Sequence, residues 1–177
     1  MDPFIDLIFR GANGLCEVDD EWLGRVVRGE VVGRPGPLVP PEELLWLKTW
    51  VMERHRFDGA DVNHLLRSYA DRLDWDIVLR RFAANGAERV LLGHLLFFGY
   101  VYPDEAAKVT DVMNEVFDRV RRAPAGGPPG VRLCRGPVLA WSQYLVDVRE
   151  WGYVDGRLEP WGDMTQAEAD AWTNAPK

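Results

Sequence analysis

The side chains best suited to chemistry are concentrated between positions 48 and 61. Six charged residues lie in this stretch: Lys48, Glu53, Arg54, Arg56, Asp58 and Asp61. Charges of both signs at this density form either a site for a charged ligand or a solvated corner where acids and bases pair. We expect the two arginines and the two aspartates to form an ion-pair network. For Lys48, two interpretations stay open: a contact with a triphosphate, or an exposed surface lysine.

A helix should position the first of these residues. Leu44, Leu47 and Val51 recur at spacings of three and four, which predicts a helix with one buried face. Pro40–Pro41 and Glu42–Glu43 suit its first turn. Proline loses no hydrogen bond there, and acids are stabilised by the positive end of the helix dipole.

The same helix is predicted to continue past Lys48 to His55 or Arg56, so that these side chains share one helix. The Asp58-Gly59 pair should then end it. Asp58 is expected to cap a second helix that begins near Ala60 and runs to Leu73. The charged residues would therefore lie at a corner between two helices.

This corner and several further segments resemble one family. A helix with lysine and then arginine, followed by an Arg-x-Asp-x-x-Asp corner and a helix with paired leucines, is similar to the second half of bacterial nucleotidyltransferase-like proteins of unknown function. The abortive-infection nucleotidyltransferase toxins show a looser version. The similarity spans nearly the whole chain, in residues 4–9, 14–15, 18–20, 50–54, 57–61, 73–76, 98–103, 134–136, 143–147 and 151–153.

The resemblance implies a two-metal site for nucleotide transfer. In such enzymes carboxylates hold two Mg²⁺ ions, which prefer oxygen ligands and clamp the attacking and leaving oxygens. An Asp-x-Asp pair follows a Gly-Ser turn that grips the triphosphate, and a third carboxylate comes from a later strand. By resemblance, Asp6 is this third metal ligand and Lys48 faces the nucleotide. The cofactors of an active form would be Mg²⁺ and a nucleoside triphosphate.

The first half of that site is missing from the sequence. Only five residues precede Asp6, with no Gly-Ser turn or Asp-x-Asp pair among them. The later Asp74-Trp75-Asp76 follows no glycine-rich loop, and we interpret Asp74 as a helix N-cap. We therefore expect a nucleotidyltransferase-like protein that is inactive alone. Two alternatives stay open: half of a split enzyme completed by a partner chain, and a non-enzymatic helical interaction or regulatory module.

The order of the patterns predicts an α+β fold that is mostly helical. Residues 1–40 are expected to form a partial nucleotidyltransferase-like sheet region, with a buried strand at 4–9 and a second short strand at 30–33. Residues 41–177 form the helical region. The expected architecture is a small N-terminal sheet remnant packed on a bundle of about six helices.

Short-range signals place the later helices. Asp74 should cap a helix over 75–84, and Thr165 and Glu168 have the spacing of a capping box for a last short helix. Apolar spacing predicts a further helix over 139–151. These predictions depend only on residues close to one another in the sequence.

The most apolar helix is predicted over 88–100. It has no consistently polar face, so we expect it to be central, with Leu92, Leu95, Leu96 and Phe98 in the core. Its apolar run is about 13 residues, shorter than the roughly 20 that cross a membrane. The N-terminus lacks the basic region of a signal peptide. We therefore expect a cytoplasmic protein that does not enter a membrane.

Composition narrows the class of protein. Hydrophobic residues make up 47% of the chain and charged residues 28%, as in ordinary globular domains. The net charge of −7 argues against a surface built entirely for nucleic acid and leaves room for a local basic patch. Cys16 and Cys134 fit no metal-ligand spacing, which indicates reduced thiols in the core of a cytoplasmic protein.

An incomplete sheet leaves an open strand edge, either at 4–9 or at Val31–Val32, and an unpaired edge tends to recruit another strand. We therefore expect a protein partner or a homodimer through the N-terminal strand edge. Charges at Asp2, Asp6 and Arg10 would weaken the first of these edges as a pairing surface.

Overall fold

The computed structural model describes residues 10, 11, 13–123 and 127–174. Of the described residues, 53% are helical, and they form nine α-helices, one 3₁₀ helix and small sheets of two strands each. This confirms the prediction of a mostly helical α+β fold. The predicted strand at 4–9, which includes Asp6, lies outside the described residues.

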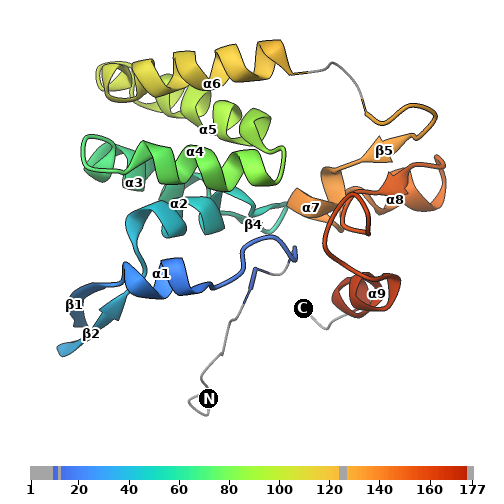
Figure 1. The fold of residues 1–177 in the computed structure, drawn as a ribbon, viewed down its shortest axis with the longest axis horizontal. Helices are drawn as coiled ribbons and strands as arrows, with labels where there is room; N and C mark the ends of the chain where they lie inside the picture. The colour runs from blue at the N-terminus through green and yellow to red at the C-terminus, as the bar shows by residue number, and fades with distance from the viewer. Residues whose placement is uncertain (1–9, 12, 124–126, 175–177) are drawn as a thin grey trace.

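The first part of the fold combines short and long helices with two hairpins. Its elements are α1 (Asp20–Gly24), β1 (Val27–Val31), β2 (Arg34–Leu38), α2 (Pro41–Thr49), β3 (Met52–Glu53), β4 (Arg56–Phe57) and α3 (Gly59–Tyr69). Figure 1 shows the β1–β2 hairpin beside α1, extending away from the stacked helices. The strand predicted at 30–33 was wrong in its bounds, because Val32 and Gly33 form the turn between β1 and β2.

The second part contains the two longest helices of the described residues. Its elements are α4 (Trp75–Ala84), α5 (Glu88–Val101), the 3₁₀ helix η1 (Ala106–Val109), α6 (Thr110–Arg122), β5 (Leu133–Cys134), α7 (Gly136–Ala140), α8 (Leu145–Arg149), β6 (Val154–Asp155) and α9 (Gln166–Asn174). In Figure 1, α4, α5 and α6 are stacked over α2, and the segment from β5 to α9 lies beside this stack. Strands β5 and β6 pair in parallel.

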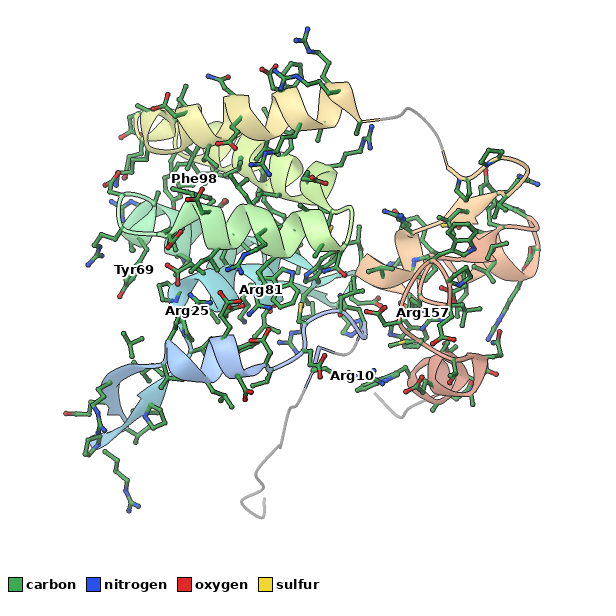
Figure 2. The ribbon with its side chains drawn as sticks, viewed as in Figure 1. Arg10, Arg25, Tyr69, Arg81, Phe98 and Arg157 are labelled. Carbon is green, nitrogen blue, oxygen red and sulfur yellow. The ribbon has the colours of Figure 1, made fainter. Side chains whose placement is uncertain are left out.

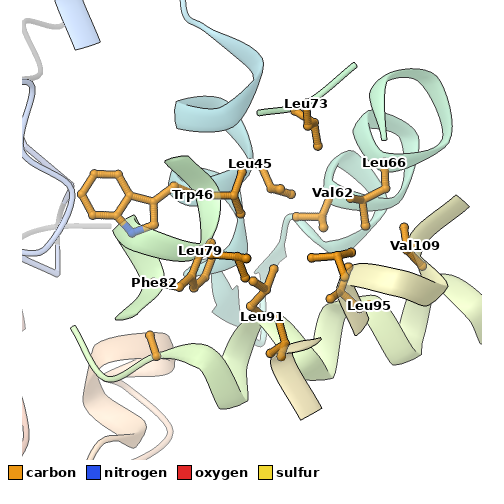
Figure 3. Close-up of a cluster of buried hydrophobic side chains, with 14 of the residues drawn as sticks. Leu45, Trp46, Val62, Leu66, Leu73, Leu79, Phe82, Leu91, Leu95 and Val109 are labelled. Atoms are coloured by element: carbon orange, nitrogen blue, oxygen red, sulfur yellow. The ribbon is translucent and has the colours of Figure 1, made fainter. Parts of the chain in front are cut away.

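The hydrophobic core lies between helices α2 to α6. Figure 3 shows its central side chains, among them Leu45, Leu66, Phe82, Leu91 and Leu95, each fully buried or nearly so. The helices contribute these residues at spacings of three and four, as expected of helices with one buried face. The core therefore sets the positions of α2 and α3, which carry the charged corner.

The helix of the charged stretch is shorter than predicted. α2 ends one residue after Lys48, and residues 52–57 form the β3–β4 hairpin. The backbone N–H of Asp58 donates to the carbonyl of Val51 at 3.1 Å, so the chain closes a turn there instead of extending the helix. Lys48 is thus at the end of a helix and Arg56 on a strand. The prediction that both share one helix was wrong.

Two capping predictions are confirmed. The Asp74 carboxylate accepts from the backbone N–H groups of Asp76 and Ile77 at the start of α4. Glu168 Oε2 accepts from the Thr165 N–H at 2.8 Å, and Thr165 Oγ1 accepts from the Glu168 N–H at 3.3 Å, which forms the capping box of α9. Both caps depend on residues within three positions of each other.

The single helix predicted over 139–151 was wrong. The chain forms α7 and α8 with a turn between them at residues 141–144. In this turn the N–H and hydroxyl of Ser142 both bind the carboxylate of Glu53, the former at 3.3 Å. A carboxylate distant in sequence thus binds the Ser142 N–H, which in a continuous helix would donate to the carbonyl of Val138.

Helix α5 is buried along one side. Leu95 and Phe98 are fully buried, as predicted, and Leu92 is half-buried. The side chain of Leu96 is 56% exposed, so its predicted burial was wrong. α5 is apolar on most sides, but α3, α4 and α6 pack on it without covering Leu96. Within the described ranges, no helix is long and apolar enough to span a membrane.

Candidate functional site

A lysine and two aspartates meet where α2 ends and α3 begins. Lys48 Nζ donates to Asp58 Oδ2 at 2.9 Å and to Asp61 Oδ2 at 2.7 Å. Arg56 Nε lies 3.4 Å from Asp58 Oδ1. We call these four residues the corner cluster. Asp58 occupies the N-cap position of α3, but its carboxylate binds the two cations and does not cap the helix, contrary to the prediction.

The ion pairs keep the corner cluster in its charged form. Hydrogen bonds to Asp61 and Asp58 raise the pKa of Lys48. Burial alone would raise the pKa of Asp58, but the hydrogen bonds from Lys48 and Arg56 outweigh it, and the pKa of Asp58 lies below its ordinary value. The ammonium group of Lys48 has three N–H donors. Two of them bind carboxylates, which leaves one for a further acceptor.

The structure joins only part of the predicted ion-pair network. Lys48 bridges Asp58 and Asp61, and Arg56 pairs directly with Asp58. The backbone N–H of Arg54 donates to Gln143 at 3.1 Å, while the Arg54 side chain forms no ion pair with another described residue. Arg54 lies in the turn between β3 and β4, because the helix expected to align it with Lys48 has already ended.

A hollow of about 320 Å³ lies beside the corner cluster, between α2 and α3. Lys48, Asp61, His64, Ser68 and Tyr69 line it together with two leucines. The Arg72 guanidinium lies 4.3 Å from the centre of the Tyr69 ring and adds a positive charge next to the hollow. The lining of the hollow therefore combines hydrogen-bonding groups, an aromatic ring and two leucines, which suits a small polar ligand.

The corner cluster does not fit a divalent metal ion. Both Asp58 and Asp61 already bind the ammonium group of Lys48, which stands where a cation would have to bind. Among the residues that the structure describes, no group of three His, Cys, Asp or Glu side chains is placed to hold a metal. Asp6, the ligand that the resemblance implies, lies outside those residues. We therefore derive no catalytic step through Mg²⁺ at this corner.

A second hollow, of about 340 Å³, lies between the turn from α4 to α5 and the C-terminal segment. Arg135 is one of its lining residues, and Arg135 Nη1 donates to the carbonyl of Gly86 at 3.3 Å. Its polar and aromatic lining includes Trp50, Asn85, Trp161 and Asp163. The lining residues Trp50, Asn85, Arg135 and Trp161 come from four distant parts of the chain and form no motif, so the sequence did not point to this site.

Sequence reasoning also missed a buried charge cluster under α1. Arg81 on α4 binds Asp19 at 2.9 Å and Glu43 at 3.1 Å. Arg25 binds Glu43 as well, and Glu42 at 3.3 Å. We call these five residues the buried charge cluster. Figure 2 labels the two arginines of this cluster, Arg25 and Arg81, which lie between α1, α2 and α4.

One signal in the sequence would have revealed this cluster. Glu43 stands three, four and seven residues before Trp46, Leu47 and Trp50, so it lies on the same face of α2 as these apolar residues. The helix dipole explains only why an acid is favoured near the start of α2, not why this one is buried. The structure leaves no exposed surface on Glu43, which needs a cation as partner in such a place.

Both cysteines are free thiols. Cys16 is fully buried, and burial followed by the nearby charge of Glu43 raises its pKa, so it stays protonated. Cys134 is half-buried, and burial raises its pKa as well. Cys16 therefore acts as a core residue, as predicted, while Cys134 lies at the edge of the packed region. Neither has the low pKa of a catalytic thiol.

The comparisons with known proteins leave the family open. No family model matches the chain, and neither the curated proteins nor the solved structures gave a match. The nucleotidyltransferase resemblance stays a prediction that depends on the sequence segments given above.

Proposed function

We propose that this chain is a nucleotidyltransferase-like protein that transfers no nucleotide by itself. In this proposal the corner cluster faces the phosphates of a nucleoside triphosphate, and a partner polypeptide supplies the Gly-Ser turn and the Asp-x-Asp pair. The metal would then bind the partner's carboxylates, with Asp6 as the third ligand. The support comes from the resemblance, from the corner geometry and from the role of Asp74.

The position of Lys48 is the observation that carries the proposal. An exposed surface lysine has no fixed partner, whereas Lys48 Nζ is held by the carboxylates of Asp58, at the N-cap position of α3, and Asp61, in its first turn. Such fixing costs side-chain entropy, which the two ion pairs offset, and it orients the ammonium group in advance for a ligand. The adjoining hollow gives a ligand access to the remaining N–H donor of Lys48.

The lack of activity in isolation is supported by the use of Asp74. The sequence contains an Asp-x-Asp pair at Asp74 and Asp76. The Asp74 carboxylate accepts hydrogen bonds from two backbone N–H groups of α4, those of Asp76 and Ile77. Both hydrogen bonds go to Asp74 Oδ1, so this carboxylate has a structural role as the cap of α4, and no glycine-rich phosphate loop precedes it.

Transfer of labelled nucleotide tests the first half of the proposal. The purified chain, with Mg²⁺ and labelled nucleoside triphosphates, should not label itself, RNA or a cell extract. Metal-dependent labelling that disappears in Asp6→Ala would contradict the proposal, since Asp6 would then work without a partner.

Nucleotide binding tests the second half. ATP titrated into the chain in a calorimeter should bind weakly, and Lys48→Met should abolish that binding. Arg54→Met is the matched control, because it removes a cation from the same stretch but outside the ion pairs of the corner cluster. An equal loss in both variants, or no binding by the unmodified chain, would argue against a nucleotide site at the corner.

A second candidate function is a non-enzymatic interaction module. It is favoured by apolar side chains that the fold leaves at the surface. Phe57 and Phe97 are exposed, with ring centres 6.0 Å apart, and Leu96 and Tyr100 lie exposed on the same helix as Phe97. Large exposed apolar patches are typical of protein contact surfaces. A partner or a second copy bound through the N-terminal strand edge would belong to this function.

A further inference from the structure

The β1–β2 hairpin stands apart from the rest of the fold. Its two strands pair with each other, with Arg28 opposite Pro37, Gly29 opposite Gly36, and Glu30 opposite Pro35. No residue from 27 to 38 makes a hydrogen bond or an ion pair with a described residue outside the hairpin. Figure 1 shows it projecting beyond α1. Within the described residues, neither outer edge of the hairpin is paired, so both can take a further strand.

The turn determines which backbone groups face outward. Val32 and Gly33 both have positive φ, 51° and 75°, as in the type I′ turn that joins two strands through two residues. Such a turn follows a hydrogen-bonded pair, here Val31 and Arg34. Hydrogen-bonded and open pairs alternate along antiparallel strands, so Gly29 and Gly36 also bond to each other. The N–H and C=O groups of Arg28 and Glu30 then face away from β2.

The two edges differ in their hydrogen-bond donors. On β2 the outward positions are occupied by Pro35 and Pro37, which have no N–H group. On β1 the outward positions are occupied by Arg28 and Glu30, each with a free N–H and C=O. Only the β1 edge can therefore both donate to and accept from an added strand.

The sequence of β1 is complementary to itself in the antiparallel direction. It is Val27-Arg28-Gly29-Glu30-Val31. If a second β1 lies antiparallel and centred on Gly29, Arg28 stands opposite Glu30 of the second copy, and Glu30 stands opposite its Arg28. These are the residues whose backbone groups face outward, so the opposed charges coincide with the hydrogen-bonded pairs.

The remaining side chains fit the same arrangement. Val27 and Val31 are 47% and 54% exposed. In this register Val27 would lie opposite Val31 of the second copy, and Val31 opposite its Val27. Arg28 and Glu30 are exposed and have no ion-pair partner among the described residues of their own chain. Pairing would thus bring together two opposite-charge pairs and two valine pairs on alternate faces of one sheet.

We propose that β1 pairs antiparallel with β1 of a second copy of this chain, in the register centred on Gly29. The product is a four-stranded sheet in the order β2–β1–β1–β2. Its two outer edges carry Pro35 and Pro37, so strand addition ends at a dimer. This inference does not depend on nucleotide transfer, and it gives the interaction function a specific partner. Strands of five residues bury little area, so we expect association in the micromolar range.

Charge reversal tests the register. By sedimentation over a micromolar concentration series, the unmodified chain should dimerise. Arg28→Glu and Glu30→Arg should each weaken the dimer at least about tenfold, because each places like charges opposite one another twice. An equal mixture of these two variants should form a mixed dimer, and the double variant R28E/E30R should dimerise like the unmodified chain. A parallel pairing or a different surface would not produce this pattern.

Several results would overturn the proposal. These are a monomer at every concentration, a dimer that both single variants leave intact, and a failure of the mixed or double variants to recover. Circular dichroism of each variant checks that it is folded. Lys48→Met should dimerise normally, so that a failure at the corner cluster is distinguishable from a failure at the hairpin. Replacing Pro35 and Pro37 with valine should produce larger assemblies, because it restores donors to the outer edge.

Discussion

Nη2 of Arg81 lies 3.1 Å from Oε1 of Glu43, whose side chain has no exposed surface. The pair connects α4 to the first turn of α2 through charges removed from water. Burial raises the pKa of Glu43, and the nearby Arg81 and Arg25 oppose that rise. Within the described part of the chain, Oε2 of Glu43 has no hydrogen-bond partner, so the carboxylate depends on these arginines.

Removal of Arg81 should therefore be severe. Arg81→Met leaves Glu43 and Asp19 without their main cation, and we expect a loss of about 3–5 kcal/mol in the free energy of unfolding. Urea denaturation measures it. Arg80→Met is the matched control, because Arg80 pairs with Glu21 at the surface and should contribute less than about 1 kcal/mol. Similar losses in both variants would show that burial of the cluster is unimportant.

The pH dependence of stability should report the same cluster. The hydrogen bond from Arg81 lowers the pKa of Asp19 from 3.8 to about 2. A carboxyl group whose pKa is lowered by folding stabilises the protein above its unfolded pKa. That contribution is lost as the pH falls through the window from 3.8 to about 2. The melting temperature of the native chain should therefore fall as the pH is lowered through this window.

Asp19→Asn should remove part of that acid sensitivity. Asparagine also caps helices, so α1 keeps its N-cap while the titrating group disappears. Asp20→Asn, at the exposed neighbouring position, is the control. Identical pH profiles for the native chain and Asp19→Asn would contradict the role given to the Arg81 hydrogen bond.

Two adjacent leucines on α5, one buried and one exposed, show how much burial contributes to the free energy of unfolding. Leu95 is fully buried between the helices, and Leu95→Ala should cost about 2–5 kcal/mol through lost burial and the remaining cavity. Leu96→Ala makes the same chemical change at an exposed position and should cost less than about 1 kcal/mol. Chemical denaturation of both variants measures the two losses in the free energy of unfolding. A loss under about 1 kcal/mol for Leu95→Ala would place α5 at the periphery.

The tip of the β1–β2 hairpin offers a stabilising substitution. Val32 is 97% exposed and has a φ of 51°, a conformation that costs a β-branched residue roughly 1–2 kcal/mol. Asparagine tolerates this conformation and is preferred before glycine in such turns. Val32→Asn should therefore raise the melting temperature, whereas Val31→Asn, on the neighbouring strand, should not. A fall in melting temperature for Val32→Asn would show that the turn has a different backbone.

Much of the helical framework followed from residues close together in the sequence. The bounds of α4 and the caps at Asp74 and Thr165 were predicted correctly, since a cap is formed by hydrogen bonds that span three residues. The buried positions Leu95 and Phe98 also followed from local apolar content. In these places the local preference and the final packing agree.

Contacts between residues far apart in the sequence determined the rest of the fold and the candidate site. The sequence determined that Lys48, Asp58 and Asp61 are charged and near one another along the chain. Only the fold ended α2 at Thr49, turned the next residues into a hairpin and joined these three side chains. Exposure of Leu96 and burial of Glu43 likewise depend on which helices pack nearby, because burial is a property of neighbours in space. The spacing of apolar residues indicates which residues share a face of a helix, but it does not indicate which face the rest of the chain will cover.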